Sequence, residues 1–223
     1  MTTISPSSRG RLTDRDIERF PQQTLLHRIA RAVCHAGCLP RKELYEAWEV
    51  ARRARRRFRG GRIVDLAAGH GLLAHVMLLL DDSSPSALVV DKTLPESTTK
   101  LHGVLVHEWP RLTGRIAFVA GAMENVEILE DDVVVSSHAC GALTDYILDR
   151  AVAARARVAV LPCCHRLATG DAGGLSGWVE RDVAIDIVRA MRLTQQGYRV
   201  WTQTIPADIT PKNRLLLGAP VHP

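Results

Sequence analysis

The feature that most constrains this chain is a short apolar run, a glycine turn and a second apolar run in immediate succession. Residues 63–67 are apolar apart from Asp65, Gly69 and Gly71 frame a tight turn, and residues 72–80 form the second run, which is long enough for a helix. A strand, a glycine turn and a helix in this order place a helix N-terminus and bare backbone against a nucleotide-like ligand. We therefore predict a ligand-binding strand–turn–helix unit here.

The rest of the chain repeats this alternation of strand-like and helix-like runs. We predict strands over residues 62–67, 87–91, 116–120, 133–137, 158–162, 198–204 and 214–217, and helices over 72–80, 95–108, 143–154 and 178–196. The alternation indicates an α/β fold with a doubly wound, mainly parallel sheet covered on both faces. The last two strands have no helix between them, so they can form an antiparallel hairpin.

The segment before the sheet is predicted to be helical. Residues 1–19 are polar, and we expect a disordered tail there. Residues 20–59 form a helical lead-in, because apolar residues such as Leu25, Leu26 and Ile29 recur at helical spacing. Gly37 and Pro40 divide the lead-in into two helices. No linker follows it, so we expect the lead-in to pack against the main domain, which spans residues 60–223.

The composition indicates a globular chain in a reducing compartment. The hydrophobic content of 46% is enough for a real core. No apolar run is long enough to cross a bilayer, and no secretory signal is visible at the N-terminus. The five cysteines are an odd number and two are adjacent, which does not fit a disulfide framework. A reducing, cytoplasmic location is the simplest expectation.

The charge is mildly basic and unevenly distributed. The net charge is +5 and the pI is about 9.2, values that are compatible with an RNA partner. Arginines gather just before the first strand, and those that could contact RNA are Arg52, Arg53, Arg55, Arg56, Arg57 and Arg59. A solvated helix end, where cations complement the helix dipole, explains the same cluster. Both interpretations remain open from the sequence.

The residues around the glycine turn suit a cofactor with an amine and a ribose. Asp65 can accept from the amine, and Asp91, at the end of the second strand, can accept from two ribose hydroxyls. The pattern lacks the third glycine of a dinucleotide fingerprint. It resembles the S-adenosyl-L-methionine (SAM) site of class I methyltransferases, most of which carry glycine where this chain has Ala67. The expected cofactor-binding residues are Asp65, Ala67, Gly69, His70, Gly71, Asp91, Lys92, Ala122, Met123 and Ser137.

Cysteines and histidines follow two predicted strands. His138 and Cys140 come after one strand, and Cys163, Cys164 and His165 come after the next. Ligand sites in a doubly wound sheet lie beyond the carboxyl ends of the strands, so these residues should converge. They can supply a general base, bind zinc or line the pocket. We expect no metal ligand, because Cys163 and Cys164 lack a two-residue gap and adjacent side chains diverge at a strand end.

Three motifs together resemble one methyltransferase branch. They are Asp-Leu-Ala-Ala-Gly-His-Gly at residues 65–71, His-Ala-Cys-Gly-Ala-Leu-Thr-Asp at 138–145 and Pro-Cys-Cys-His at 162–165. The branch includes the methyltransferase domain of glutathione-S-transferase C-terminal-domain-containing proteins and the tRNA acceptor-stem 2′-O-methyltransferases. The resemblance covers roughly residues 22–218, is closer to the first group, and implies a Rossmann-like seven-stranded sheet.

The resemblance also implies an activity. We expect SAM-dependent methyl transfer to an oxygen or nitrogen nucleophile, with RNA, in particular tRNA, as the acceptor. The expected catalytic residues are His138, His165, Asp145, Cys140, Cys163 and Cys164. Among them, His138 is the leading candidate for contact with the nucleophile, and His165 is the second. Asp145 orients His138 or accepts from the substrate, unless it only caps the helix that it opens. A small-molecule methyltransferase, and a SAM- or RNA-binding module without turnover, are the alternatives.

Overall fold

The chain folds around one seven-stranded sheet. The computed structural model describes residues 5–165 and 167–221. The strands are β1 (Ile63–Leu66), β2 (Ala87–Asp91), β3 (Ile116–Ala120), β4 (Val133–Ser136), β5 (Arg157–Val160), β6 (Tyr198–Thr204) and β7 (Arg214–Pro220). Their spatial order is β3-β2-β1-β4-β5-β7-β6; the first five are parallel, and β7 is antiparallel to both β5 and β6. The predicted doubly wound sheet and its closing hairpin are confirmed.

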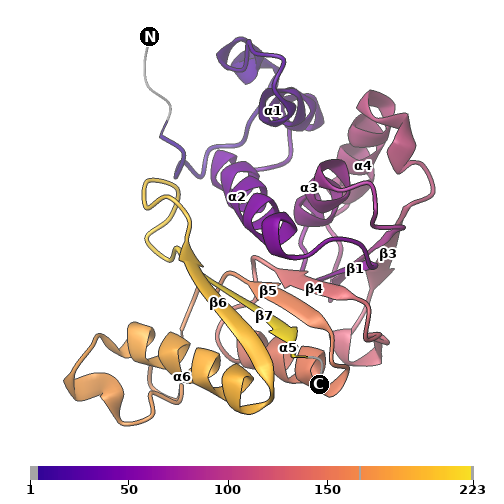
Figure 1. The fold of residues 1–223 in the computed structure, drawn as a ribbon. Coiled ribbons are helices and arrows are strands. Elements are labelled where there is room, and N and C mark those ends of the chain that lie inside the picture. Colours follow the sequence, from indigo (N-terminus) through magenta and orange to yellow (C-terminus); the bar gives the residue numbers. More distant parts are fainter. Residues whose placement is uncertain (1–4, 166, 222–223) are drawn as a thin grey trace.

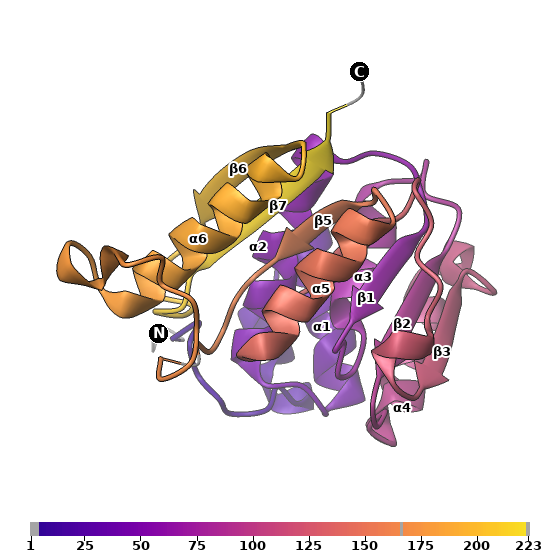
Figure 2. The ribbon, with the colours of Figure 1, turned by 90° about the horizontal axis from the view of Figure 1, so that it is seen from below.

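Helices cover both faces of this sheet (Figures 1 and 2). One face carries α1 (Leu25–Ala36), α2 (Arg41–Arg57), α3 (Leu72–Leu80) and α4 (Ser97–Glu108), and the other carries α5 (Ala142–Ala153) and α6 (Arg181–Gln195). Successive strand residues point to opposite faces, so Ile63 packs with the first helices whereas Val64 packs with α5 and α6. Both sides are buried, which explains why the strands are almost continuously apolar.

The helical lead-in packs into the main core and forms part of it. Leu44, Ala47, Val50 and Ala54 repeat at helical spacing along α2 and are buried with the residues of α3 and the sheet. β1 begins a few residues after α2 ends. The C-terminal end of α2 therefore lies at the amino edge of the sheet, and its N-terminal end lies toward the carboxyl edge, where ligand sites are expected.

Residues 5–19 differ from the expected disordered tail. Leu12 is fully buried, its backbone N–H donates to Leu39 O at 2.9 Å, and residues 14–19 form a 3₁₀ helix, η1 (Asp14–Arg19). Two apolar side chains, Leu12 and Phe20, fix this polar segment onto α1 and α2. Residues 1–4 of the expected tail lie outside the described residues.

One further difference concerns the start of a helix. The predicted helix over residues 178–196 begins at Arg181, because a 3₁₀ turn, η4 (Leu175–Gly177), precedes it and leaves Trp178 exposed. A second short turn, η2 (Pro110–Leu112), links α4 to β3, and a third, η3 (Met123–Asn125), follows β3. Within the described ranges, the helices are too short or too polar to cross a membrane.

Candidate active site

The glycine turn after β1 forms the centre of the carboxyl edge. Ala67, Gly69 and Gly71 all have positive φ, at 55°, 54° and 74°. A Cβ on Gly71 would lie 2.8 Å from Val89 Cγ1, so this position requires glycine. A Cβ on Gly69 would meet nothing within 4 Å. The turn thus packs tightly on β2 at Gly71 and is open at Gly69, where a ligand can approach the backbone.

Two carboxylates flank the turn. Asp65 is buried in β1; its Oδ2 accepts from Ala74 N at 3.2 Å, whereas its buried Oδ1 has no hydrogen-bond partner among the described residues. Burial raises the pKa of Asp65 to about 8, against the opposing effect of the Ala74 N–H. Asp91 Oδ2 accepts from Gly69 N at 2.8 Å. An unused buried acceptor, an open backbone position and a second carboxylate fit a cofactor with an amine and ribose hydroxyls.

Two other expected cofactor residues, His70 and Ser137, lie at or beside this turn. The His70 Nε2 is 3.0 Å from Ser97 Oγ at the start of α4. His70, Ser137 and His138 line one small pocket of about 10 Å³. The pocket is roofed by Glu43 and Ala47 of α2, which the sequence analysis did not place at the site. In the sequence, Glu43 and Ala47 are marked only by their position one to three helical turns before the arginine cluster on the same helix.

The remaining expected cofactor residues lie farther along the same edge. Gly121 N donates to Asp91 O at 2.9 Å, which ties the turn after β3 to the end of β2. Ala122 follows this turn and is exposed, and Met123 is half-buried in η3. Lys92 follows Asp91 and is exposed. These positions surround the end of β2, where the sequence predicts the ribose and adenine of the cofactor.

His138 is the imidazole that the fold places beside the turn. It follows β4 and is half-buried. Burial lowers its pKa, and the Lys42 ammonium lowers it further, while Asp91 opposes the shift. The imidazole is therefore neutral at pH 7, the state in which it can accept a proton. Lys42, at the N-terminal end of α2, is a third residue that the sequence analysis missed.

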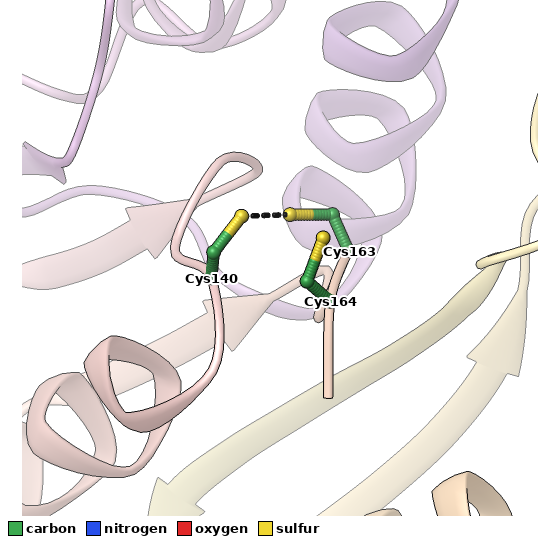
Figure 3. A group of neighbouring side chains, drawn as sticks. All are labelled: Cys140, Cys163 and Cys164. Carbon is green, nitrogen blue, oxygen red and sulfur yellow. Dashed lines mark hydrogen bonds between the residues drawn. The ribbon is translucent and has the colours of Figure 1, made fainter. Parts of the chain in front are cut away.

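The three cysteines predicted at this edge do converge (Figure 3). The Sγ atoms of Cys140, Cys163 and Cys164 all lie within 4.8 Å of one another, and those of Cys140 and Cys163 are 2.8 Å apart. Burial raises the pKa of the Cys140 and Cys163 thiols. The expected divergence of Cys163 and Cys164 is wrong, because β5 ends at Val160 and both residues follow in a loop without strand alternation.

His165 and Asp145 belong to a different group of side chains. His165 Nε2 is 2.8 Å from Asp186 Oδ1 of α6, and both carboxylate oxygens of Asp145 accept from Arg189 at 2.8 Å. Arg189 also donates to Asp186 at 3.1 Å. The expectation that Asp145 orients His138 is therefore wrong, since its carboxylate faces α6. The same contacts tie His165 to α6 and set it apart from the glycine turn.

The arginine cluster is only partly available to a partner. Arg55 is buried and donates to Met77 O and Ser84 Oγ, which rules out contact with phosphate. Arg52 and Arg53 pair with Glu49, and Arg59 lies 3.6 Å from Asp81. Arg56 and Arg57 are exposed. All of these side chains belong to the C-terminal half of α2 or the residues after it, at the amino edge of the sheet and opposite the glycine turn.

Comparison with known proteins agrees with this architecture. A family model described as a methyltransferase domain matches residues 42–170, more than half of the chain. A glutathione S-transferase C-terminal domain-containing protein from Xenopus laevis is 24% identical over 205 residues, covering 73% of this chain. This chain spans only 31% of that relative.

Two solved structures share the fold. An O-methyltransferase family protein from Burkholderia thailandensis is 18% identical, with a TM-score of 0.54 over 94% of this chain and 63% of that one. The SAM-dependent methyltransferase SibL is 17% identical, with a TM-score of 0.54 over 92% and 65% of the two chains. At these identities the likeness concerns the fold. The family match over more than half of the chain shows that it belongs to the methyltransferase-domain family.

Proposed function

We propose that this chain transfers the methyl group of SAM to an oxygen or nitrogen nucleophile that is held at His138. The observation that carries the proposal is the shared pocket of His138, Ser137 and the glycine-turn residue His70. One edge of the sheet therefore combines the cofactor-binding turn with an imidazole of lowered pKa. When bound, SAM supplies an electrophilic methyl group on a positively charged sulfur, so positioning accounts for much of the catalysis.

Each residue has a role in this proposal. Asp91 accepts hydrogen bonds from the cofactor, and the open backbone at Gly69 lets it approach closely. The positively charged amine of the cofactor lowers the raised pKa of Asp65, so that its unpaired Oδ1 can accept as a carboxylate oxygen. The neutral imidazole of His138 accepts the proton that the nucleophile releases as it gains the methyl group. Burial, and to a lesser degree the Lys42 ammonium, keep the pKa of His138 low, so the base is available at neutral pH. Two of the other predicted catalytic residues, His165 and Asp145, hold α6 against the loops at this edge.

We place a small molecule first among the acceptors. Glu43 and Ala47 of α2 roof the pocket that contains His138, and the loop between β6 and β7 extends toward the N-terminal end of α2 (Figure 1). The N-terminal half of α2 thus covers His138 from one side and limits the access of a folded nucleic acid from that side.

RNA, in particular tRNA, is the second candidate acceptor. The net charge of +5 and the exposed Arg56 and Arg57 favour it, because Lys and Arg contacts to phosphate dominate RNA binding. These arginines lie at the edge opposite His138, so an RNA acceptor would have to extend along α2, whose 17 residues span about 25 Å. A cell extract incubated with methyl-labelled SAM and fractionated into RNA, protein and small molecules separates the two candidates.

Two variants test the assignment of the site. Asp91→Ala should weaken SAM binding by about 10- to 100-fold, because it removes a charged acceptor of two hydrogen bonds. His138→Ala should leave SAM affinity within a few-fold and reduce methyl transfer by roughly 10²–10⁴-fold. Asp149→Ala, which removes an exposed carboxylate of α5 away from the glycine turn, is the matched control for binding by isothermal titration calorimetry. Equal SAM affinity in Asp91→Ala and the wild type would overturn the assignment of Asp91.

A further inference from the structure

Three thiols meet where the loops after β4 and β5 come together. Cys140 comes from the first loop, and Cys163 and Cys164 come from the second (Figure 3). Their three Sγ atoms lie within 4.8 Å of one another. We propose that Cys140, Cys163 and Cys164 bind a zinc ion with one coordination position left open. The proposal is independent of the acceptor and of methyl transfer, because it concerns only these thiols.

The distances are close to those of a zinc–thiolate site. Zinc binds cysteine sulfur at about 2.3 Å, so tetrahedral thiolates lie about 3.8 Å apart. The pair Cys140 and Cys163, at 2.8 Å, would have to separate by about 1 Å to reach this value. Rotation about the χ1 bond of an exposed residue such as Cys140 can provide this movement. The ion therefore requires only side-chain adjustment.

The backbone holds the two loops together without any ligand. Gly141 N donates to Cys164 O at 2.8 Å, directly between the two cysteine-bearing segments. Gly141 has φ 60° and ψ −122°, a conformation that favours glycine and directs the chain from Cys140 into α5. Leu161 N donates to Ser136 O at 2.9 Å and extends the pairing of β4 and β5 up to the loops. The cluster is thus pre-organised.

The exposure of the thiols distinguishes them from packing cysteines. Cys34 and Cys38 are buried among the apolar residues of the lead-in, as cysteines that only fill a core are. Cys140 and Cys164 are exposed, and Cys163 is half-buried. Exposed thiols in contact are prone to oxidation, which a bound metal prevents. A disulfide would use two of the sulfurs and leave the third beside it, whereas an ion uses all three.

The ligand set favours zinc and an open position. Soft thiolates select zinc over magnesium or calcium, which prefer oxygen ligands. Among residues 5–165 and 167–221, no histidine, aspartate or glutamate joins the three cysteines. Zinc sites with three protein ligands keep the fourth position for water or a substrate donor. Lys42 is near enough to Cys140 to interact with it electrostatically, and it reduces the excess negative charge of three thiolates around a divalent ion.

The test measures metal directly in the full chain. Protein purified under reducing conditions in zinc-containing medium should hold one zinc per chain by mass spectrometry. Replacement with Co²⁺ should produce ultraviolet thiolate-to-cobalt absorption and visible bands of a tetrahedral site. Cys163→Ser should weaken cobalt binding by at least about 100-fold, since loss of an outer-shell partner alone costs about 10–100-fold. Cys38→Ser is the matched control and should retain both the zinc and the spectrum.

Two results would overturn the zinc proposal. A reduced wild type with neither zinc nor thiolate-to-cobalt absorption overturns the proposal, as does an unchanged spectrum in Cys163→Ser. If Cys163→Ser fails to fold by circular dichroism, the exposed Cys164→Ser replaces it and should also lose the thiolate absorption. None of these readouts depends on SAM, so failure of the zinc proposal leaves the methyltransferase assignment untouched, and loss of methyl transfer leaves the zinc result standing.

Discussion

At the scale of one residue, Asp65 shows how the site keeps a buried oxygen unpaired until a ligand binds. Its carboxyl group is buried at the centre of the sheet, with one oxygen bonded to Ala74 N and the other without a partner among the described residues. A buried acceptor without a donor is unfavourable until a ligand supplies one. The sequence placed Asp65 inside the first strand and Asp91 at the end of the second, as the structure has them, because strand position follows from the apolar runs around them. The unsatisfied oxygen depends on side-chain packing, which the sequence pattern does not contain.

The pKa of Asp65 predicts how stability depends on pH. Its pKa is about 8 in the folded chain and about 3.9 when unfolded, so the folded chain binds more protons between these values. The contribution of Asp65 to the free energy of unfolding should therefore fall as pH rises from about 4 to 8, by up to about 1.4 kcal/mol per pH unit. Buried histidines of lowered pKa, such as His75 and His138, contribute in the opposite direction below about pH 6.5. Asp65→Asn should remove only the Asp65 contribution, so the stability difference between the variant and the wild type should change with pH in urea unfolding of the SAM-free protein between pH 5 and 8.

The control for this experiment is Asp208→Asn, which changes an exposed aspartate and should leave the slope unaltered. Asp182 and Asp186 have lowered pKa values, Asp182 mainly through its hydrogen bond to Arg214 and Asp186 through His165 and Arg214 against its burial. The stabilisation that Asp182 and Asp186 contribute is lost only as pH falls below about 4, which is outside the pH range of the experiment. A slope that is the same in Asp65→Asn and the wild type would contradict a carboxyl group of raised pKa at this position.

At the scale of elements, α5 and α6 are joined by charge as well as by apolar packing. Arg189 of α6 is buried and donates to Asp145 of α5, to Asp186 and to Gly141 O. The strands could be predicted because burial on both faces leaves continuous apolar runs. The partners of Asp145 and His165 could not, because Arg189 and Asp186 lie 44 and 21 residues away along the chain. The fixed N-terminal segment was missed because two isolated apolar residues, Leu12 and Phe20, form no periodic pattern.

The α5–α6 contact predicts a stability effect. Asp145→Asn should lower the free energy of unfolding by about 1–3 kcal/mol, because it leaves the buried Arg189 with one carboxylate in place of two. The value stays below the full cost of breaking a buried pair, since the Asp145 side chain is 33% exposed. Asp149→Asn, on the same helix and opposite the exposed Arg192, is the matched control and should change stability by less than about 0.5 kcal/mol. Guanidinium unfolding measures both.

A different result would return Asp145 to the catalytic group. If Asp145→Asn keeps the wild-type stability and instead lowers methyl transfer with unchanged SAM affinity, its main role is at the substrate. Under the proposal, any loss of transfer should be matched by a loss of folded protein. Activity at a temperature well below the unfolding transition separates the two, because a purely structural defect is then largely suppressed.

At the scale of the whole molecule, α2 connects two ends with different chemistry. Its N-terminal turns carry Lys42 and Glu43 to the pocket of His138, and its C-terminal turns carry the arginines to the opposite edge. The sequence located the arginine cluster but not the edge on which it lies. That placement depends on how α2 packs across α3 and the sheet. The distribution of charge therefore separates the catalytic edge from the most basic edge.

This separation predicts that the exposed arginines are dispensable for methyl transfer. The double variant Arg56→Ala, Arg57→Ala should keep kcat/KM within about two-fold of the wild type with the small-molecule fraction as acceptor, because neither side chain is near His138. Removal of the Arg57 contact with the Trp201 ring should cost at most about 1 kcal/mol of stability.

An RNA acceptor predicts the opposite result: transfer should fall by at least tenfold and depend less steeply on salt, since each lost phosphate contact lowers the salt slope by about 1. Transfer of labelled methyl groups to each fraction, measured at two salt concentrations, decides between the two acceptor classes. SAM affinity is measured alongside. A tenfold loss of transfer with intact SAM binding would show that the acceptor is RNA and not a small molecule.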